Sequence, residues 1–184
     1  MMIKKNIFLT GSVGVGKSKI ISKVIKQLSL NISGFSVARE GKKNNWNSFY
    51  LVQASSFNNN NQSKKSEFNR FAFRSDYSKN WEINIRVFDK LGVQLLTNID
   101  DADVVIMDEL GRFELTAFKF QKKVIEVLNS DKPVLGVIKD ESNVFLDDIR
   151  NRKDVQIFRV TLENREEVYK EVLFLIKQII TLKE

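Results

Sequence analysis

Short runs of apolar residues alternate along this chain with stretches in which apolar residues recur three and four positions apart. Apolar runs bounded by polar turns are typical of buried strands, whereas the wider spacing is typical of helices that lie on a sheet. The pattern predicts strands over residues 7–9, 35–38, 48–52, 102–107, 133–138 and 155–161. It predicts helices over residues 20–28, 81–98, 117–129, 144–150 and 164–182.

This alternation continues along the chain and indicates an α/β fold, with a mostly parallel sheet and helices on both faces. No linker or internal repeat divides the sequence, so we expect residues 1–184 to form one domain. Residues 40–45 have the composition of a turn. The polar residues 58–65 are expected to form a solvent-exposed loop.

The amino-acid composition excludes several kinds of chemistry, because the chain has no cysteine and no histidine. Disulfides, thiolate nucleophiles, histidine-based triads and metal sites built on these residues are all ruled out. A proton acceptor must therefore be Asp, Glu, Lys or Tyr, and a metal ion must be held by oxygen ligands, which favours Mg²⁺. No apolar stretch has the length of a membrane span, and we expect a cytoplasmic protein with no membrane partner.

The formal net charge of +7 has two interpretations. A positive surface attracts nucleic acid, but scattered lysines also serve simply to keep a protein surface solvated. The lysines here are spread over the predicted helices rather than gathered in one stripe. We therefore favour the solvated surface and keep nucleic acid as the alternative partner; nothing in the sequence indicates an obligate protein partner.

The residues after the first predicted strand have the form GxxxxGK[ST], which is typical of a phosphate-binding loop. Its glycines let backbone N–H groups point inward around a phosphate chain, and Lys17 reaches the β- and γ-phosphates. Ser18 offers a hydroxyl to Mg²⁺ at the start of a helix, whose positive end faces the anion. The predicted nucleotide-binding residues of the loop are Gly11, Ser12, Val13, Gly14, Val15, Gly16, Lys17 and Ser18.

A second motif follows the strand predicted over residues 102–107, which leads directly into Asp108 and Glu109. A buried parallel strand carries such carboxylates to the carboxyl edge of the sheet, where the phosphate loop also lies. We expect Asp108 to bind Mg²⁺ together with Ser18, as the acid of a Walker B strand does. Glu109 is expected to orient and deprotonate the attacking water, so Lys17, Asp108 and Glu109 are the predicted catalytic residues. The alternative for Glu109 is structural, as a turn cap or the partner of a lysine.

The turn that follows continues the same edge and adds weaker candidates. Gly111 is assigned to nucleotide binding because a glycine allows positive φ or a close approach of the backbone, although an ordinary turn also accounts for it. Arg112 either neutralises transition-state charge or lies on the surface. Glu114 is expected to brace a basic residue.

The end of the last predicted strand supplies the final candidates, Asn164 and Arg165. Thr161 or Asn164 suits the N-cap of the last helix, and acidic residues follow in its first turn. Alternatively, Arg165 contacts the nucleotide, because a loop after the last strand of such a sheet passes near the ligand. Both interpretations remain open at this point.

Several of these stretches resemble the THEP-type, or cancer-related, P-loop nucleoside triphosphatases. The matching segments are residues 8–18, 105–115, 132–135 and 160–165. The resemblance implies a RecA-like P-loop domain that hydrolyses nucleoside 5′-triphosphates with Mg²⁺ and tolerates different bases. It marks Asp108 and Glu109 as the carboxylate pair, and Asn164 and Arg165 as residues of the active edge.

The chain departs from this family pattern in its middle region. Residues 71–74 follow a polar insert where the family usually has a glycine-containing segment, and Arg112 and Phe113 replace the commoner Lys-Met. Contacts with the substrate are therefore expected to differ there.

Hydrolysis of nucleoside triphosphates to the diphosphate and phosphate is the predicted function. One alternative is a nucleoside or nucleotide kinase on the same fold, in which Arg150, Arg152 and Lys153 form a phosphate-sensing lid. The other alternative is a nucleic-acid-linked ATPase, suggested by the positive charge.

Overall fold

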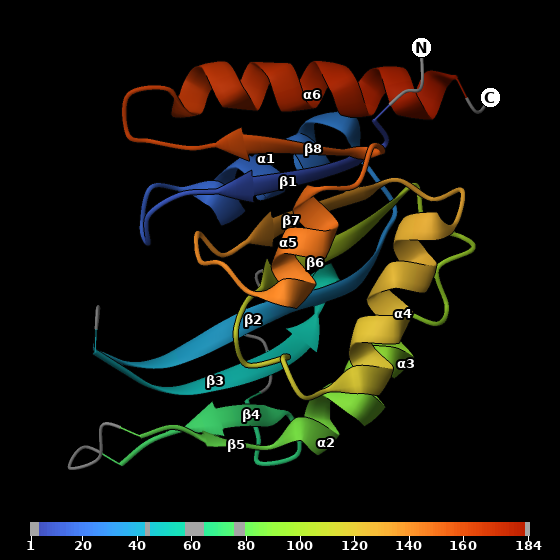
Figure 1. Ribbon diagram of the computed structural model, residues 1–184. Coiled ribbons are helices and arrows are strands. Elements are labelled where there is room, and N and C mark those ends of the chain that lie inside the picture. Colours follow the sequence, from blue (N-terminus) through green and yellow to red (C-terminus); the bar gives the residue numbers. More distant parts are fainter. Residues whose placement is uncertain (1–3, 43–44, 58–64, 76–79, 183–184) are drawn as a thin grey trace.

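A single mixed sheet runs through the centre of the molecule (Figure 1). The structure is a computed structural model and describes residues 4–42, 45–57, 65–75 and 80–182. Within these ranges the sheet has eight strands in the order β5-β4-β3-β2-β6-β7-β1-β8. The strands are β1 (Asn6–Thr10), β2 (Ile32–Lys42), β3 (Asn45–Gln53), β4 (Arg70–Phe73), β5 (Glu82–Ile83), β6 (Val104–Leu110), β7 (Val134–Ile138) and β8 (Val155–Arg159).

The sheet has a parallel part and an antiparallel part. Strands β2, β6, β7, β1 and β8 are parallel neighbours, whereas β3, β4 and β5 extend the sheet as antiparallel strands beyond β2. The parallel strands all end at one edge, and this brings the ends of β1 and β6 close together in space.

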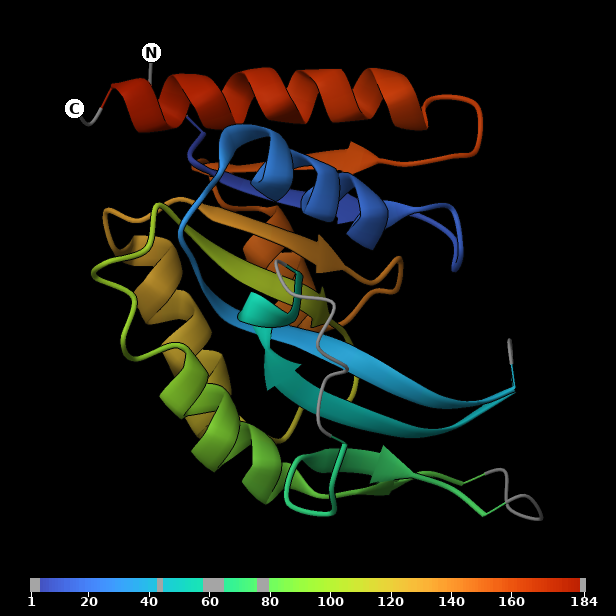
Figure 2. The same cartoon turned by 180° about the vertical axis from the view of Figure 1, so that it is seen from behind.

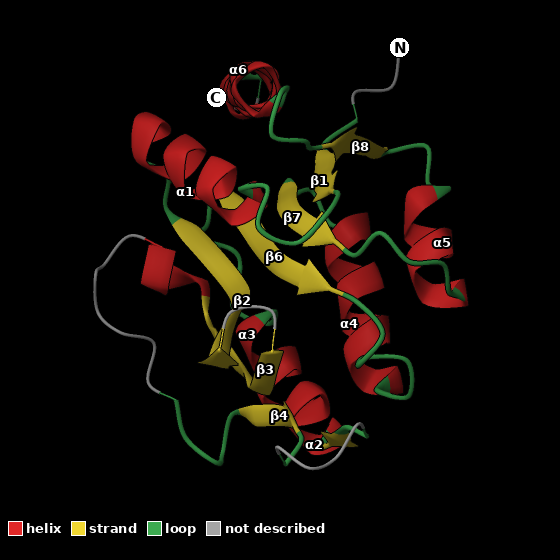
Figure 3. Cartoon of the chain, turned by 90° about the vertical axis from the view of Figure 1, so that its left-hand side faces the viewer, coloured by secondary structure: helices red, strands yellow, loops and turns green. Residues whose placement is uncertain are grey.

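Helices cover both faces of the sheet, as Figures 2 and 3 show. Helices α1 (Lys17–Leu28) and α6 (Arg165–Thr181) lie on one face, and α4 (Phe118–Asn129) and α5 (Val144–Arg150) lie on the other. A helical segment beside α4 consists of α2 (Ile85–Val87), the π-helical turn η2 (Phe88–Gly92) and α3 (Val93–Leu95). A short 3₁₀ turn, η1 (Ala54–Phe57), follows β3.

The core consists of two apolar layers, one on each side of the sheet. Successive side chains of a strand point to opposite faces, so Ile7 and Leu9 join the layer under α1 and α6. Phe8, between them, joins the layer under α4 and α5. In β6, Ile106 and Met107 divide in the same way. Strands buried on both faces explain the continuous apolar runs in the sequence.

Most predicted elements are present, with different ends. The strand predicted to end at residue 107 continues to Leu110, so the two carboxylates belong to the strand itself. The last strand ends at Arg159 instead of residue 161. Strands β2 and β3 pair as a hairpin, and the turn predicted over residues 40–45 is too long, because residues 40–42 and 45 belong to the strands; residues 43–44 lie outside the described residues. Most of the predicted polar loop, residues 58–64, also lies outside them.

The helix predicted over residues 81–98 is wrong at both ends, since the helical segment runs only from Ile85 to Leu95. Residues 82–83 instead pair with β4, and Trp81 packs against Phe49 and Phe113. Edge-strand pairing and aromatic contacts therefore override the helical periodicity at this point.

Within the described ranges, no helix is both long enough and apolar enough to cross a membrane.

Gly34 in β2 lies directly beside the backbone of Ile106 in β6. Its φ is +101°, and a Cβ atom added there would lie 2.1 Å from the carbonyl oxygen of Ile106. We expect Gly34→Ala to lower the free energy of unfolding by about 3 kcal/mol or more, because left-handed strain and a backbone clash add together. Urea denaturation monitored by circular dichroism measures the loss. The matched control is Gly14→Ala, which has a φ of +87° but open space around the added atom, and should cost only about 1–2 kcal/mol.

Candidate active site

The phosphate-binding motif forms a loop between β1 and α1, at the edge where the parallel strands end. Gly11, Gly14 and Gly16 all have positive φ, at 124°, 87° and 106°. Residues with a Cβ atom rarely adopt this backbone, which explains the spacing of the glycines. Gly16 directly precedes the first turn of α1, so the positive end of the helix faces the loop.

Lys17 is the first residue of α1, and its side chain reaches back to the loop. Its Nζ donates hydrogen bonds to the carbonyl oxygens of Gly11 and Ser12, both at 2.7 Å. Burial lowers the pKa of Lys17, and the negative charge of Glu109 opposes that shift. The ammonium group is therefore held within the loop and faces a carboxylate of β6.

Asp108 lies next to the start of α1, as the sequence predicts. Its side chain is buried and accepts a hydrogen bond from the Ser18 side chain. Burial raises the pKa of Asp108 to about 6, although the Ser18 hydrogen bond acts in the opposite direction. The predicted magnesium ligands are therefore in contact with each other.

A carboxylate and a hydroxyl form a set of hard oxygen donors that suits Mg²⁺. The described residues contain no group of three or more His, Cys, Asp or Glu that could hold a metal ion. Mg²⁺ commonly takes only one or two protein carboxylates and completes its shell with phosphate oxygens and water. The pair Ser18 and Asp108 fits this habit.

The Glu109 side chain contacts different residues from those around Asp108. Its Oε1 lies 3.1 Å from Lys139 Nζ and 3.2 Å from Arg39 Nη2, and its side chain is 11% exposed. The lysine pairing considered as a structural alternative is thus present. It does not remove the carboxylate from the site, because Glu109 and Arg39 line one pocket with Gly14, Gly16 and Lys17.

The sequence interpretation missed both cations, Arg39 and Lys139. Arg39 lies on β2, three residues after Ser36, which is paired in register with Asp108. Lys139 directly follows β7, the other neighbour of β6. The one sequence feature that could have identified these residues is their position, because each is a basic residue near the end of a strand that neighbours the carboxylate strand β6.

The family model described as NTPase matches residues 6–173. The chain belongs to this NTPase family. The predicted enzyme class and P-loop fold are thereby confirmed.

Two similar proteins have been named for their activity. The nucleoside-triphosphatase THEP1 of Thermotoga maritima is 31% identical over 175 residues, which cover 93% of this chain and 95% of the relative. The human cancer-related nucleoside-triphosphatase is 27% identical and covers 92% of this chain and 95% of its own length.

Two solved structures have the same fold as this NTPase. The solution structure of a human cancer-related nucleoside triphosphatase aligns with a TM-score of 0.70 at 25% identity, over 95% of this chain and 98% of the other. The crystal structure of THEP1 from Aquifex aeolicus aligns with a TM-score of 0.71 at 23% identity, over 93% and 98% respectively.

The turn after β6 in this NTPase is closed by Glu114. The buried side chain of Glu114 accepts a hydrogen bond from the Gly111 backbone N–H at 3.1 Å, so its observed role is to close the turn instead of bracing a basic residue. Gly111 is not among the glycines with positive φ, and an added Cβ would lie 3.0 Å from Lys139 Cγ. The backbone therefore does not require a glycine here, and an added Cβ would meet mainly the flexible Lys139 side chain. Arg112 is exposed and lies over the ring of Phe113.

Burial raises the pKa of Glu114 to about 8 from an ordinary value of 4.5. The unfolded chain therefore releases this proton at a lower pH than the folded NTPase does, and stability falls as pH rises between about 4.5 and 8. We expect Glu114→Gln, which keeps an oxygen acceptor for Gly111, to reduce this fall. Urea unfolding at pH 5 and pH 8 should show the variant gaining on the parent by about 1 kcal/mol or more at the higher pH. Parallel pH profiles of the two proteins would contradict the assignment.

The predicted residues Asn164 and Arg165 stand at the start of α6. Asn164 occupies the N-cap position, but its side chain makes no cap hydrogen bond to the helix. Instead it accepts from the Thr161 N–H at 2.8 Å and donates to the Arg159 carbonyl at 2.9 Å, which fixes the loop.

This loop lies at the same edge as the phosphate loop (Figure 1), where the Val160 N–H donates to the Thr10 carbonyl at 2.9 Å. Neither the exposed Arg165 nor the half-buried Asn164 belongs to the described lining of the phosphate-loop pocket. A nucleotide contact by either residue stays a prediction.

Proposed function

We propose that this protein hydrolyses nucleoside 5′-triphosphates to the diphosphate and phosphate in a reaction that depends on Mg²⁺. The observation that carries the proposal is the placement of two consecutive carboxylates at the phosphate loop. Asp108 contacts Ser18, and Glu109 lines the pocket that contains Lys17. The names of the relatives, which are nucleoside triphosphatases, support the same reaction.

Each residue has a proposed role in that reaction. Residues 11–18 bind the phosphate chain through backbone N–H groups, and Lys17 pairs with the β- and γ-phosphates. Ser18 and Asp108 hold Mg²⁺, which when bound neutralises charge on the phosphate oxygens. Glu109 accepts a proton from water as that water attacks the γ-phosphorus, and the bond to the β-γ bridging oxygen breaks.

Arg39 and Lys139 orient the general base. Two ion pairs fix the Glu109 carboxylate, as second groups do for catalytic bases in general. Arg39 also lines the phosphate-loop pocket and is placed to stabilise negative charge that develops on the γ-phosphate. The cytoplasm is the proposed place of action of the protein, because nucleoside triphosphates and Mg²⁺ are plentiful there.

Steady-state phosphate release tests the proposal. ATP, GTP, CTP and UTP are each supplied alone, with Mg²⁺ and with a chelator, and we expect turnover of several of them only with the metal. A requirement for a phosphoryl acceptor would favour the kinase alternative. Stimulation by added DNA or RNA that weakens with salt would favour the nucleic-acid-linked ATPase.

Two of the three residues considered for a kinase lid, Arg150 and Arg152, pair with other residues of the protein. Arg150 pairs with Asp147 at 2.7 Å and also donates to the Lys139 carbonyl, while Arg152 pairs with Asp154 at 2.7 Å. These contacts anchor the end of α5. Because both arginines are already paired, the hydrolase proposal is better supported than the kinase alternative.

A further inference from the structure

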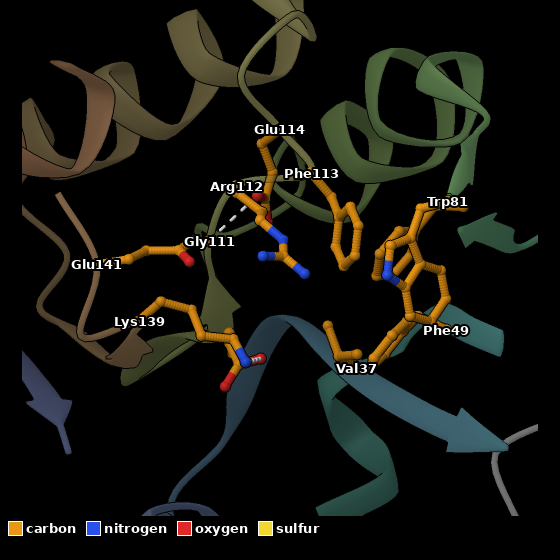
Figure 4. A pocket seen from close by; sticks show the side chains of 11 residues that line it. Val37, Phe49, Trp81, Gly111, Arg112, Phe113, Glu114, Lys139 and Glu141 are labelled. Atoms are coloured by element: carbon orange, nitrogen blue, oxygen red, sulfur yellow. Dashed lines mark hydrogen bonds and ion pairs between the residues drawn. The ribbon is translucent and has the colours of Figure 1, made fainter. Parts of the chain in front are cut away.

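A second pocket opens beside Glu109, and its lining differs from that of the phosphate loop. Glu109 is the residue that the described linings of the two pockets share. The second pocket has a volume of about 170 Å³. Figure 4 shows aromatic rings on one side of it and charged side chains on the other. We refer to it as the aromatic pocket; its apolar lining is Val37, Phe49, Phe71, Trp81 and Phe113.

The aromatic side of the pocket is a preformed surface for a flat ring. Trp81 lies 5.0 Å from Phe49 and 5.4 Å from Phe113 between ring centroids, and Phe49 lies 5.5 Å from Phe113. These rings come from different parts of the chain and stiffen one another through their contacts. Stacking and edge contacts with a planar ligand therefore require little ordering of the protein.

The polar side contains an oxygen without a partner. Glu141 Oε1 is buried and has no hydrogen-bond partner among the described residues. Buried polar atoms in proteins are nearly always paired, because an unpaired one loses its hydration without compensation. Figure 4 shows the Glu141 carboxylate directed toward Gly111, and Lys139 and Arg112 lie nearby. This arrangement is suited to a ligand that brings an N–H donor for the carboxylate and an acceptor for the cations.

The volume limits the ligand to one ring. A protein cavity of roughly 150 Å³ accommodates benzene, so about 170 Å³ suits a single six-membered ring better than a fused pair. Carboxylates recognise an exocyclic amine, as acidic side chains do for the amino group of cytosine.

We propose that the aromatic pocket is a second ligand site, which takes a small molecule with one heteroaromatic ring and an amino group at its edge. The ring packs against Phe49, Trp81 and Phe113, and the amino group donates to Glu141. The site lies beyond the phosphate loop, and its existence does not depend on the hydrolysis proposed above.

Fluorescence of Trp81 provides a local test. The chain has two tryptophans, so Trp46→Phe leaves Trp81 as the sole indole in the protein. Cytosine is the probe, and uracil is the matched compound in which a carbonyl replaces the amine. We expect cytosine to quench Trp81 in a saturable titration and uracil to bind at least tenfold more weakly. Equal binding of both compounds, or no saturable change with either, would overturn the proposal.

Variants in the same background separate this site from the nucleotide site. Glu141→Gln should weaken cytosine binding about tenfold or more, since a charge-assisted hydrogen bond is lost. Phe113→Leu should weaken it severalfold through the aromatic side. The control Glu171→Gln changes an exposed carboxylate of α6 and should leave the affinity unchanged. Quenching by cytosine should persist when ADP and Mg²⁺ are present. Loss of cytosine binding in the presence of ADP and Mg²⁺ would refute the site. Parental affinity for cytosine in Glu141→Gln would refute it as well.

Discussion

Replacing Glu109 by Gln is expected to lower kcat for phosphate release by about 10²–10⁴-fold while the variant still binds nucleotide. The amide retains the size of the side chain but cannot accept a proton from water. The hydrogen bonds that hold Lys17 and Asp108 do not involve the substituted group, although the Glu109 charge raises the pKa of both residues. Single-turnover phosphate release, together with nucleotide affinity measured by calorimetry, separates the loss of chemistry from a loss of binding.

A second explanation for such a loss must be tested, because Glu109 also pairs with Arg39 and Lys139. If disturbed cations caused the defect, Lys139→Met would impair turnover as much as Glu109→Gln does. We expect Lys139→Met to cost about tenfold, since the carboxylate remains and loses only one of its two partners. Near-parental phosphate release by Glu109→Gln would show that another group activates the water.

The phosphate loop and Asp108 could be predicted because short stretches of consecutive residues identify them. The glycines, Lys17 and Ser18 lie within eight consecutive residues, and each requirement of the motif is met by a residue type. Asp108 follows an apolar run that can only be a buried strand or a buried helix, and its length favours the strand. The parallel sheet then places the end of this strand beside the loop.

Arg39 and Lys139 could not be predicted in the same way. Each lies on or after a different strand, and only the strand order β2-β6-β7 brings them to opposite sides of Glu109. Single basic residues at strand ends are common and carry no spacing that marks them. Their role follows from the topology of the sheet, which a linear pattern does not determine.

The aromatic pocket could not be predicted from the linear sequence for the same reason, since its residues come from separate parts of the chain. Phe49 belongs to β3, Trp81 directly precedes β5 and Phe113 follows β6. The helical periodicity that includes Trp81 predicted a helix start there. Two ring contacts of Trp81, a cation–π contact from Arg74 and a two-residue edge strand fix the backbone instead. Tertiary packing of large rings outweighs the weak preference of a short segment.

Replacing Asp108 by Asn is expected to lower kcat/KM by about 10²–10³-fold and to raise the Mg²⁺ concentration needed for half-maximal rate. The amide is a poorer ligand than a carboxylate for a hard cation, and several kcal/mol of charge stabilisation in the transition state is at risk. Initial rates measured over a range of nucleotide concentrations from well below to well above KM give kcat/KM, and a Mg²⁺ titration gives the metal concentration needed for half-maximal rate.

The same substitution should leave the fold at least as stable as the parent without nucleotide. Asp108 is buried, and burial opposes its ionisation, whereas Asn has the same shape and keeps an acceptor for Ser18. Opposite changes in activity and in melting temperature would identify Asp108 as a residue retained for chemistry at the expense of stability. Ser18→Ala is the matched control, since it removes the other proposed ligand and leaves the buried carboxylate in place. A parental Mg²⁺ dependence in Asp108→Asn would place the metal elsewhere.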